Sequence, residues 1–238
     1  MSQVIHRADS RGHADHGWLN SHHTFSFASY FDPKRMGFGA LRVINDDVVA
    51  PSRGFGTHPH ANMEIISVPL EGSLAHKDTM GHDFVISKGE VQAMTAGTGV
   101  AHSEFNHSDR ESVNFLQIWV LPRLMGVKPA YSQKTFEPNE RVNRWQLVVS
   151  PDGRQGSVTI NQDAHFSMAK IDVGRSLDYE LQGDDHGAYI FVISGNVKVD
   201  GETLGPRDGL GLTDPKLLTI AAESDAEILL MDVPMTVI

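Results

Sequence analysis

Between residues 64 and 121 the chain is a series of short apolar segments separated by glycines. The segments read EIISVPL, SLAHKD, FVIS, EVQAMTA and NFLQIWVLP, and Gly72 and Gly89 fall where turns between strands are expected. None of them has the 3.6-residue repeat of a helix over a useful length. The pattern predicts an all-β domain, in which about eight short strands close into two facing sheets around an interior that holds one small ligand.

Two pairs of candidate metal ligands lie in the same half of the chain. His58 and His60 are two residues apart, so on a strand their side chains point the same way with Cα atoms roughly 6.5 Å apart. His102 and Glu104 repeat this spacing about forty residues later. If the two strands are neighbours, three imidazole nitrogens and one carboxylate oxygen converge. Such a set suits Fe, Ni, Cu, Co, Mn or Zn rather than Ca or Mg.

Two carboxylates compete for the fourth position. Glu64 lies four residues after His60, and Glu104 lies two residues after His102. Spacing alone allows either one, because both can share a face with the histidines. The carboxylate that does not bind the ion can still serve the site, by fixing the tautomer of a ligating histidine.

The motifs around these residues resemble a known family. Residues 54–64 follow the pattern GxxxHxHxxxE and residues 99–106 follow GxxHxxxN, the two-part signature of cupins, although Gly97 stands where many cupins have proline. The run HGWLNSHHTFSFASYFDPKRMGFGALRVINDD at residues 16–47, with GFGTHPHANMEI and AGTGVAHSEFN, is similar to the pirin family of two-domain cupins. Within that family it most resembles the bacterial members assigned as quercetin 2,3-dioxygenases. The match is dense over the first half and holds only in outline over the second.

The resemblance implies the ligands position by position. They are His58 and His60 of THPH, and His102 and Glu104 of HSE. Glu104 is thereby favoured over Glu64, which becomes an acceptor beside the site or at the edge of the core. The expected cofactor is one divalent transition metal ion per chain, iron first, with nickel, cobalt, copper, manganese or zinc as alternatives.

The resemblance also implies an activity. A metal-dependent dioxygenase is expected to cleave flavonols such as quercetin with dioxygen and with loss of carbon monoxide. The flavonol would bind the metal through its deprotonated 3-hydroxyl, with Glu104 as the base, a role typically worth about 10²–10⁴ in rate. Phe55, Phe105 and Trp119 are candidates to stack on the substrate or to fill the core. The alternative is a non-catalytic pirin-type module, a transcription cofactor-like protein that responds to the redox state of its metal.

Composition limits the class of protein further. At 238 residues the chain has the length of two small barrels, and without cysteine any metal must use N and O ligands. The net charge of −10 and the lack of clustered Lys and Arg argue against direct nucleic-acid binding, whereas a protein partner is compatible. No stretch approaches the roughly eighteen apolar residues of a membrane span, and no apolar signal segment is visible. A cytoplasmic protein without membrane contact is expected.

The two halves of the chain are expected to differ in role. We predict an N-terminal cupin domain with the metal site over residues 1–130, a linker over 131–144, and a C-terminal cupin-like domain without metal ligands over 145–238. Eleven of the 13 histidines precede residue 108. His165 and His186 are then expected to be isolated. When the hairpins of the two halves are aligned, the ligand positions of the first half fall near Leu181, Gly183, Ala221 and Glu223.

Two strands are expected in the N-terminal region. HTFSFASYF alternates aromatic and small residues as a half-buried strand does, and it ends at Asp32 and Pro33. GALRVINDDVV predicts a second strand, with a turn at residues 45–47. The nearby histidines are expected in surface or hydrogen-bonding roles, with one or more at the mouth of the pocket; they are His13, His16, His22 and His23.

Overall fold

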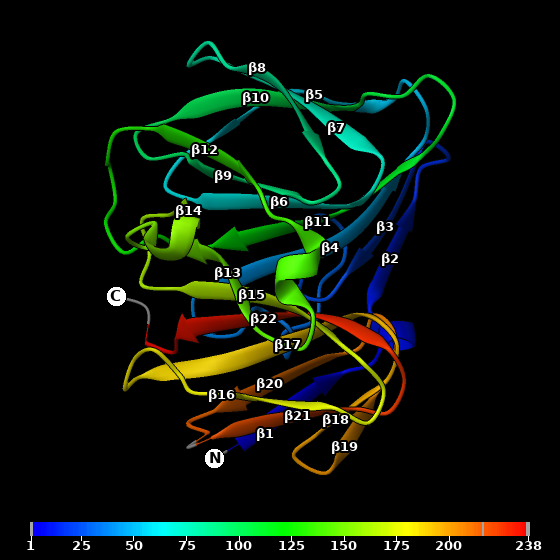
Figure 1. Cartoon of the computed structure of the whole chain (residues 1–238). Coiled ribbons are helices and arrows are strands. Elements are labelled where there is room, and N and C mark those ends of the chain that lie inside the picture. Colours follow the sequence, from blue (N-terminus) through cyan, green and yellow to red (C-terminus); the bar gives the residue numbers. More distant parts are fainter. Residues whose placement is uncertain (1, 216, 237–238) are drawn as a thin grey trace.

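The computed structural model describes residues 2–215 and 217–236, and most of these lie in β-strands. In Figure 1 four sheets are stacked in the order small, large, large, small. One small and one large sheet form each β-sandwich, and the two large sheets meet at the centre of the molecule. The prediction of an all-β fold with two tandem cupin barrels is confirmed.

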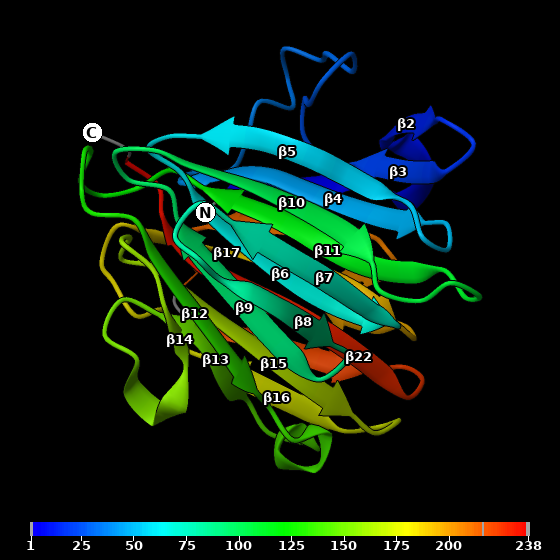
Figure 2. The same cartoon turned by 90° about the horizontal axis from the view of Figure 1, so that it is seen from above.

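The N-terminal sandwich consists of a seven-stranded and a four-stranded sheet. The large sheet has the order β12 (Ala130–Thr135), β9 (Glu90–Thr95), β6 (Glu64–Glu71), β11 (Val113–Val120), β4 (Leu41–Val49), β3 (Leu19–His23) and β2 (Gly12–Asp15). The small sheet has the order β5 (Gly54–His60), β10 (Val100–Asn106), β7 (Ser73–Asp78) and β8 (Asp83–Ser87). Seen from above in Figure 2, β5, β10 and β7 cover β4, β11 and β6.

The C-terminal sandwich repeats this architecture. Its large sheet has the order β1 (Ser2–His6), β20 (Gly209–Thr213), β17 (His186–Ser194), β22 (Ala226–Pro234), β15 (His165–Ile171), β13 (Gln146–Ser150) and β14 (Val158–Thr159). Its small sheet has the order β16 (Ser176–Tyr179), β21 (Leu218–Ala222), β18 (Val197–Val199) and β19 (Glu202–Leu204). The helical segments are the 3-10 turns η1 (Ala8–Ser10), η2 (Pro138–Arg141) and η3 (Arg154–Gly156). Within the described residues, no helix has the length and hydropathy needed to cross a membrane.

The alternation of side chains along each strand divides the core into layers. On β6, Ile66 and Val68 face the second half of the chain and belong to one buried cluster with Phe166 and Met231. Ile65, at the intervening position, belongs to a different cluster of the N-terminal half. Each large apolar side chain buried in this way contributes about 1.5–3 kcal/mol. The surface between the halves is therefore a continuous core.

The N-terminal strand of the chain belongs to the second half. β1 pairs with β20, from Ser2 opposite Thr213 to His6 opposite Gly209, and Figure 1 shows this blue strand among the orange strands of the second half. The predicted linker of residues 131–144 contains most of β12, which pairs with β9 of the first half. The proposed division at these residues stays a prediction. The structure adds that the first half is one continuous segment, from β2 to β12, whereas the second half combines β1 with the strands from β13 onward.

The predicted strand over HTFSFASYF is wrong beyond His23. Residues 24–31 form a loop because its two phenylalanines pack in different places. Phe25 lies 5.7 Å from Tyr189 between ring centroids, at the centre of the molecule, whereas Phe27 lies 5.4 Å from Trp119. The alternating phenylalanines that suggested a strand instead hold a loop in place, because each packs in a different part of the molecule.

The predicted turn at residues 45–47 is also wrong, because these residues lie inside β4. They pair with β3 on one side and with β11 on the other. Their polarity has partners within the fold. Asp47 accepts a hydrogen bond from Ser21, and Asp46 forms ion pairs with Arg11 and Arg207 at 3.4 and 3.1 Å. A polar run therefore occupies the middle of a strand.

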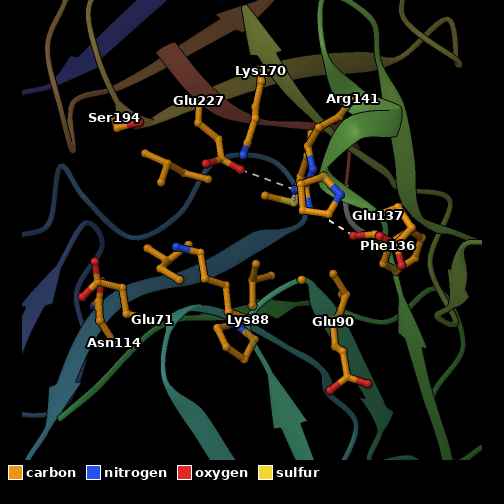
Figure 3. A pocket seen from close by; sticks show the side chains of 18 of the residues that line it. Glu71, Lys88, Glu90, Asn114, Phe136, Glu137, Arg141, Lys170, Ser194 and Glu227 are labelled. Atoms are coloured by element: carbon orange, nitrogen blue, oxygen red, sulfur yellow. Dashed lines mark hydrogen bonds and ion pairs between the residues drawn. The ribbon is translucent and has the colours of Figure 1, made fainter. Parts of the chain in front are cut away.

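A cavity of about 560 Å³ opens between the two halves beside η2 (Figure 3). Its opposite walls carry Lys170 of the second half and Lys88 of the first. Arg141, which is buried, lies 3.5 Å from Glu227. The predicted metal ligands do not line this cavity, so its charges are separate from the site described next.

Candidate metal centre

The two strands that carry the histidine pairs are neighbours in the small N-terminal sheet. β5 and β10 are antiparallel, and His58 lies directly opposite His102 in their register. The ring centroids are 4.8 Å apart for His58 and His60, 4.5 Å for His58 and His102, and 4.9 Å for His60 and His102. Each ring offers one nitrogen within 4.8 Å of the other two. The structure brings these three residues close enough to hold one ion.

Glu104 is buried and is held by strands of the opposite sheet. Gln117 Nε2 donates a hydrogen bond of 2.6 Å to Oε2, and the Ser67 hydroxyl lies 3.1 Å from Oε1. Glu104 forms a second group of ligand atoms within 4.8 Å of one another, together with His76 and His102. His102 is common to both groups. Burial raises the pKa of Glu104 to about 7, against the hydrogen bond from Ser67.

Glu64, the competing carboxylate, contacts different partners. Its Oε2 accepts hydrogen bonds from Thr95 Oγ1 at 2.5 Å and from the backbone N–H of Asn161 at 3.0 Å. Because Asn161 belongs to the second half of the chain, Glu64 ties the two halves together. The suggestion that Glu64 fixes the tautomer of a ligating histidine is therefore wrong. Strand parity misplaced it because the chain bends at Asn62, which has φ 51°, between β5 and β6.

The position of Glu64 gives a testable dependence of stability on pH. Burial raises its pKa from 4.5 to about 7, so the folded state binds this proton more tightly than the unfolded chain does. The stabilisation of the folded state that comes from protonated Glu64 is therefore fully present below pH 4.5 and is lost as the pH rises toward 7. Between pH 5 and pH 8 the wild type should lose about 2–3 kcal/mol of unfolding free energy through this group. Glu64→Gln, which cannot titrate here, should lack this decrease. Urea unfolding of both proteins at the two pH values measures this difference, and an equal pH dependence in both would contradict it.

A second row of polar residues lies behind His102, and sequence reasoning missed it. His76 Nδ1 lies 3.4 Å from His102 Nδ1, and His76 Nε2 lies 3.1 Å from Asp78 Oδ2. The carboxylate of Asp78 can only accept, so His76 carries its proton on Nε2 and accepts through Nδ1. His102 then donates from Nδ1 and keeps a bare lone pair on Nε2. The available signal was the i, i+2 spacing of His76 and Asp78 in SLAHKD.

The nitrogen left bare by this arrangement fits a metal ion. His102 Nε2 is buried and has no hydrogen-bond partner within the described part of the chain, a costly state unless a ligand satisfies it. Burial, reinforced by the neighbouring rings, lowers the pKa of His102 to about 3, and burial lowers that of His60 to about 4. Both rings are therefore neutral at physiological pH, as metal ligation requires.

The role of His76 can be separated from simple packing. We expect His76→Leu to weaken metal affinity by about 10–100-fold, because His102 loses the acceptor that fixes its tautomer. His76→Gln keeps an acceptor oxygen and should recover much of the affinity. His82→Ala is the matched control, since His82 Nδ1 lies 2.9 Å from Asp78 and His82 has no contact with His102. Competition titrations with a chelator measure the affinities, and equal values for the leucine and glutamine variants would refute the tautomer role.

A cavity of about 370 Å³ adjoins the site. It is lined by His58 and Glu104, by Gln117 beside them, and by the aromatic side chains of Phe27, Phe55 and Trp119. Two of the aromatic candidates from the sequence, Phe55 and Trp119, therefore face the cavity. Phe105 does not line it and is 40% exposed.

The N-terminal histidines supply part of the wall opposite the metal ligands. His16 and His23 line the cavity, which confirms that some of this group lie at the pocket. His23 Nε2 lies 2.8 Å from Ser21 Oγ, and Ser21 donates to Asp47, which also lines the cavity. Burial raises the pKa of Asp47 to about 7, against the hydrogen bond from Ser21. The cavity thus has one apolar side and two buried carboxyl groups.

The sequence of the first half matches the pirin family model over residues 4–120, and the second half matches the quercetinase C-terminal cupin domain over residues 147–233. The chain is also 44% identical over 230 residues to the quercetin 2,3-dioxygenase of Escherichia coli K12, covering 97% of this chain and 98% of that protein. The chain belongs to the pirin family.

Other pirins agree with this assignment. The pirin-like protein of Caulobacter vibrioides is 40% identical over 94% of this chain and 96% of its own. The crystal structure of the bacterial pirin YhhW from Escherichia coli in complex with nickel(II) superposes with a TM-score of 0.93 at 43% identity, covering 99% of this chain and 100% of that one. Both predictions, of the pirin family and of the two-barrel cupin fold, are confirmed.

Proposed function

We propose that this protein is a metal-dependent dioxygenase that cleaves flavonols such as quercetin. The observation that carries the proposal is the uncommitted Nε2 of His102, which lies among the rings of His58 and His60 and has Glu104 beside it. A cavity with aromatic walls adjoins this group. Relatives that carry the name quercetin 2,3-dioxygenase are similar over nearly the whole chain, which supports the same activity here.

His58, His60 and His102 would hold one divalent transition metal ion, with Glu104 as the fourth ligand. Nickel in the complex of the Escherichia coli pirin supports a metal at a site of this kind, and we keep iron as the first expectation for this chain. Four protein ligands leave one or two positions open on a five- or six-coordinate ion. When bound, the ion would supply Lewis acidity toward an oxygen of the substrate.

The protein side of the reaction follows from the cavity. A flat flavonol would insert between the aromatic side chains, of which Phe27 and Trp119 meet edge to face at 86°. Glu104 would accept the proton of the 3-hydroxyl on a carboxylate oxygen, leaving the electron pair on the substrate oxygen. Gln117 and Ser67 fix the carboxylate, so its oxygens are positioned before the substrate enters.

The experiment begins with elemental analysis of the purified protein. The protein is then incubated with quercetin in air and without oxygen, and loss of the flavonol absorbance and release of carbon monoxide are followed. A chelator-treated sample, assayed before and after metal is restored, is the control. We expect loss of quercetin only with both metal and oxygen. A protein that holds metal but leaves quercetin unchanged in air would overturn the enzymatic proposal and favour the redox-responsive binding module. Its cytoplasmic location and any protein partner stay predictions.

A further inference from the structure

The C-terminal barrel contains a second cluster of metal-ligand residues. His165 on β15, His186 on β17 and Asp232 on β22 come from adjacent strands, and His165 lies directly opposite Asp232 in the register. Each offers one ligand atom within 4.8 Å of the other two. Their exposed fractions are 3%, 5% and 0%. The expectation that the two histidines of the second half are isolated is therefore wrong.

All three side chains face the interior of the second barrel. Asp232 lies on the same face of β22 as Leu230, and His186 lies on the same face of β17 as Ala188, because alternate residues share a face. Leu230 and Ala188 both belong to the buried cluster of the C-terminal sandwich. The strands of a sheet therefore hold the three polar groups in fixed positions within apolar surroundings, as is typical of a preformed binding site.

Hydrogen bonds account for Asp232 and for Nδ1 of His186, but not for Nδ1 of His165. Asp232 Oδ2 accepts from the Tyr179 hydroxyl at 3.1 Å and from the backbone N–H of Gln182 at 2.8 Å. Its Oδ1 lies 2.5 Å from His186 Nδ1. In contrast, His165 Nδ1 is buried and has no hydrogen-bond partner among the residues that the structure describes. A buried nitrogen without a partner, beside a second imidazole and a carboxylate, is the same signal that marks His102 in the first barrel.

We propose that His165, His186 and Asp232 form a second binding site for a divalent transition metal ion. Two imidazoles and one carboxylate select Fe, Co, Ni or Zn over Ca and Mg. A metal ion held by both His186 Nδ1 and Asp232 Oδ1 would displace the proton now shared between them. The ring proton would then sit on Nε2, which lies 3.8 Å from the carboxylate of Asp163. A carboxylate behind a ligating histidine is the usual outer partner in such sites. The two ligand atoms must separate to about 3 Å, the spacing of neighbouring ligands at bonds of roughly 2.1 Å.

The second site lies on a different sheet of its barrel from the first one. The first set of histidines comes from the small sheet of its barrel, whereas His165, His186 and Asp232 all come from the large sheet. An ion here would tie β15, β22 and β17 together at one end of the sheet. The proposal does not depend on the dioxygenase activity.

The test counts metal ions per chain. Chelator-treated protein is titrated with nickel(II), and bound metal is measured by equilibrium dialysis and by calorimetry. We expect two equivalents for the wild type and one for His60→Ala, which lacks the first site. Adding His165→Gln to His60→Ala should remove the remaining equivalent, and His107→Ala, an exposed histidine outside both sites, should change nothing.

Two results would overturn the proposal. One is a single equivalent in the wild type with none in His60→Ala. The other is a second equivalent that persists in both His165→Gln and Asp232→Asn, since it must then bind elsewhere. Thermal unfolding with and without nickel guards against a folding defect, because only a variant that folds and has lost its metal-dependent rise in Tm counts as loss of the site.

Discussion

Glu104→Gln is expected to lower kcat for quercetin consumption by about 10²–10⁴-fold, the range of a positioned general base. Glutamine keeps the shape of the side chain and an oxygen that can accept from Ser67, but it cannot take the proton of the 3-hydroxyl at neutral pH. Gln117 would then face an uncharged partner where it now donates at 2.6 Å to a carboxylate. Initial rates at saturating quercetin, with metal content measured on the same samples, give the comparison.

Glu64→Gln is the matched control for this experiment. Both glutamates are buried, and burial raises the pKa of each to about 7, but only Glu104 lines the cavity beside the histidines. The control should keep its full kcat. If Glu104→Gln retained both metal and wild-type turnover, the proton would have to go elsewhere, and Asp47 on the opposite wall would be the next residue to replace.

His102→Ala is expected to weaken metal binding at the first site by more than about 100-fold, beyond the 10–100-fold typical of losing an outer partner. His102 belongs to both groups of ligand atoms, so its loss separates His58 and His60 from Glu104. Activity should fall with the metal. Metal content after dialysis against a weak chelator measures the effect, with His107→Ala as the surface control.

The outcome that would contradict this prediction is retention of one tightly bound ion with unchanged activity in His102→Ala. Because a second metal site is proposed in the C-terminal barrel, the comparison is made in a background with His165→Gln. His102 lies on β10, which pairs with β5 on one side and β7 on the other, so a substitution that disrupted this strand would disturb the whole small sheet. Cooperative unfolding of the variant therefore excludes loss of folding as the cause.

The sequence predicted most reliably what depends on short spacing. The i, i+2 positions of His58 and His60 share a face wherever that strand lies, because the alternation of side chains is a property of the backbone. The turns at Gly72 and Gly89 followed from residue type in the same way, and both glycines have positive φ, 73° and 91°. Counting parity across a bend failed, as Glu64 shows, because a bend resets which face is which.

Tertiary structure alone decided which distant groups meet. His76 and His102 lie 26 residues apart, and they touch because β7 and β10 pair in one particular register. His165, His186 and Asp232 span the second half and meet because β15, β22 and β17 are neighbours. Local pattern sets the face of each strand, but the packing of whole sheets sets the order and register of strands. The sequence by itself therefore predicted the fold class and which three histidines of the first half lie together. Only the folded chain showed which distant residues contact them.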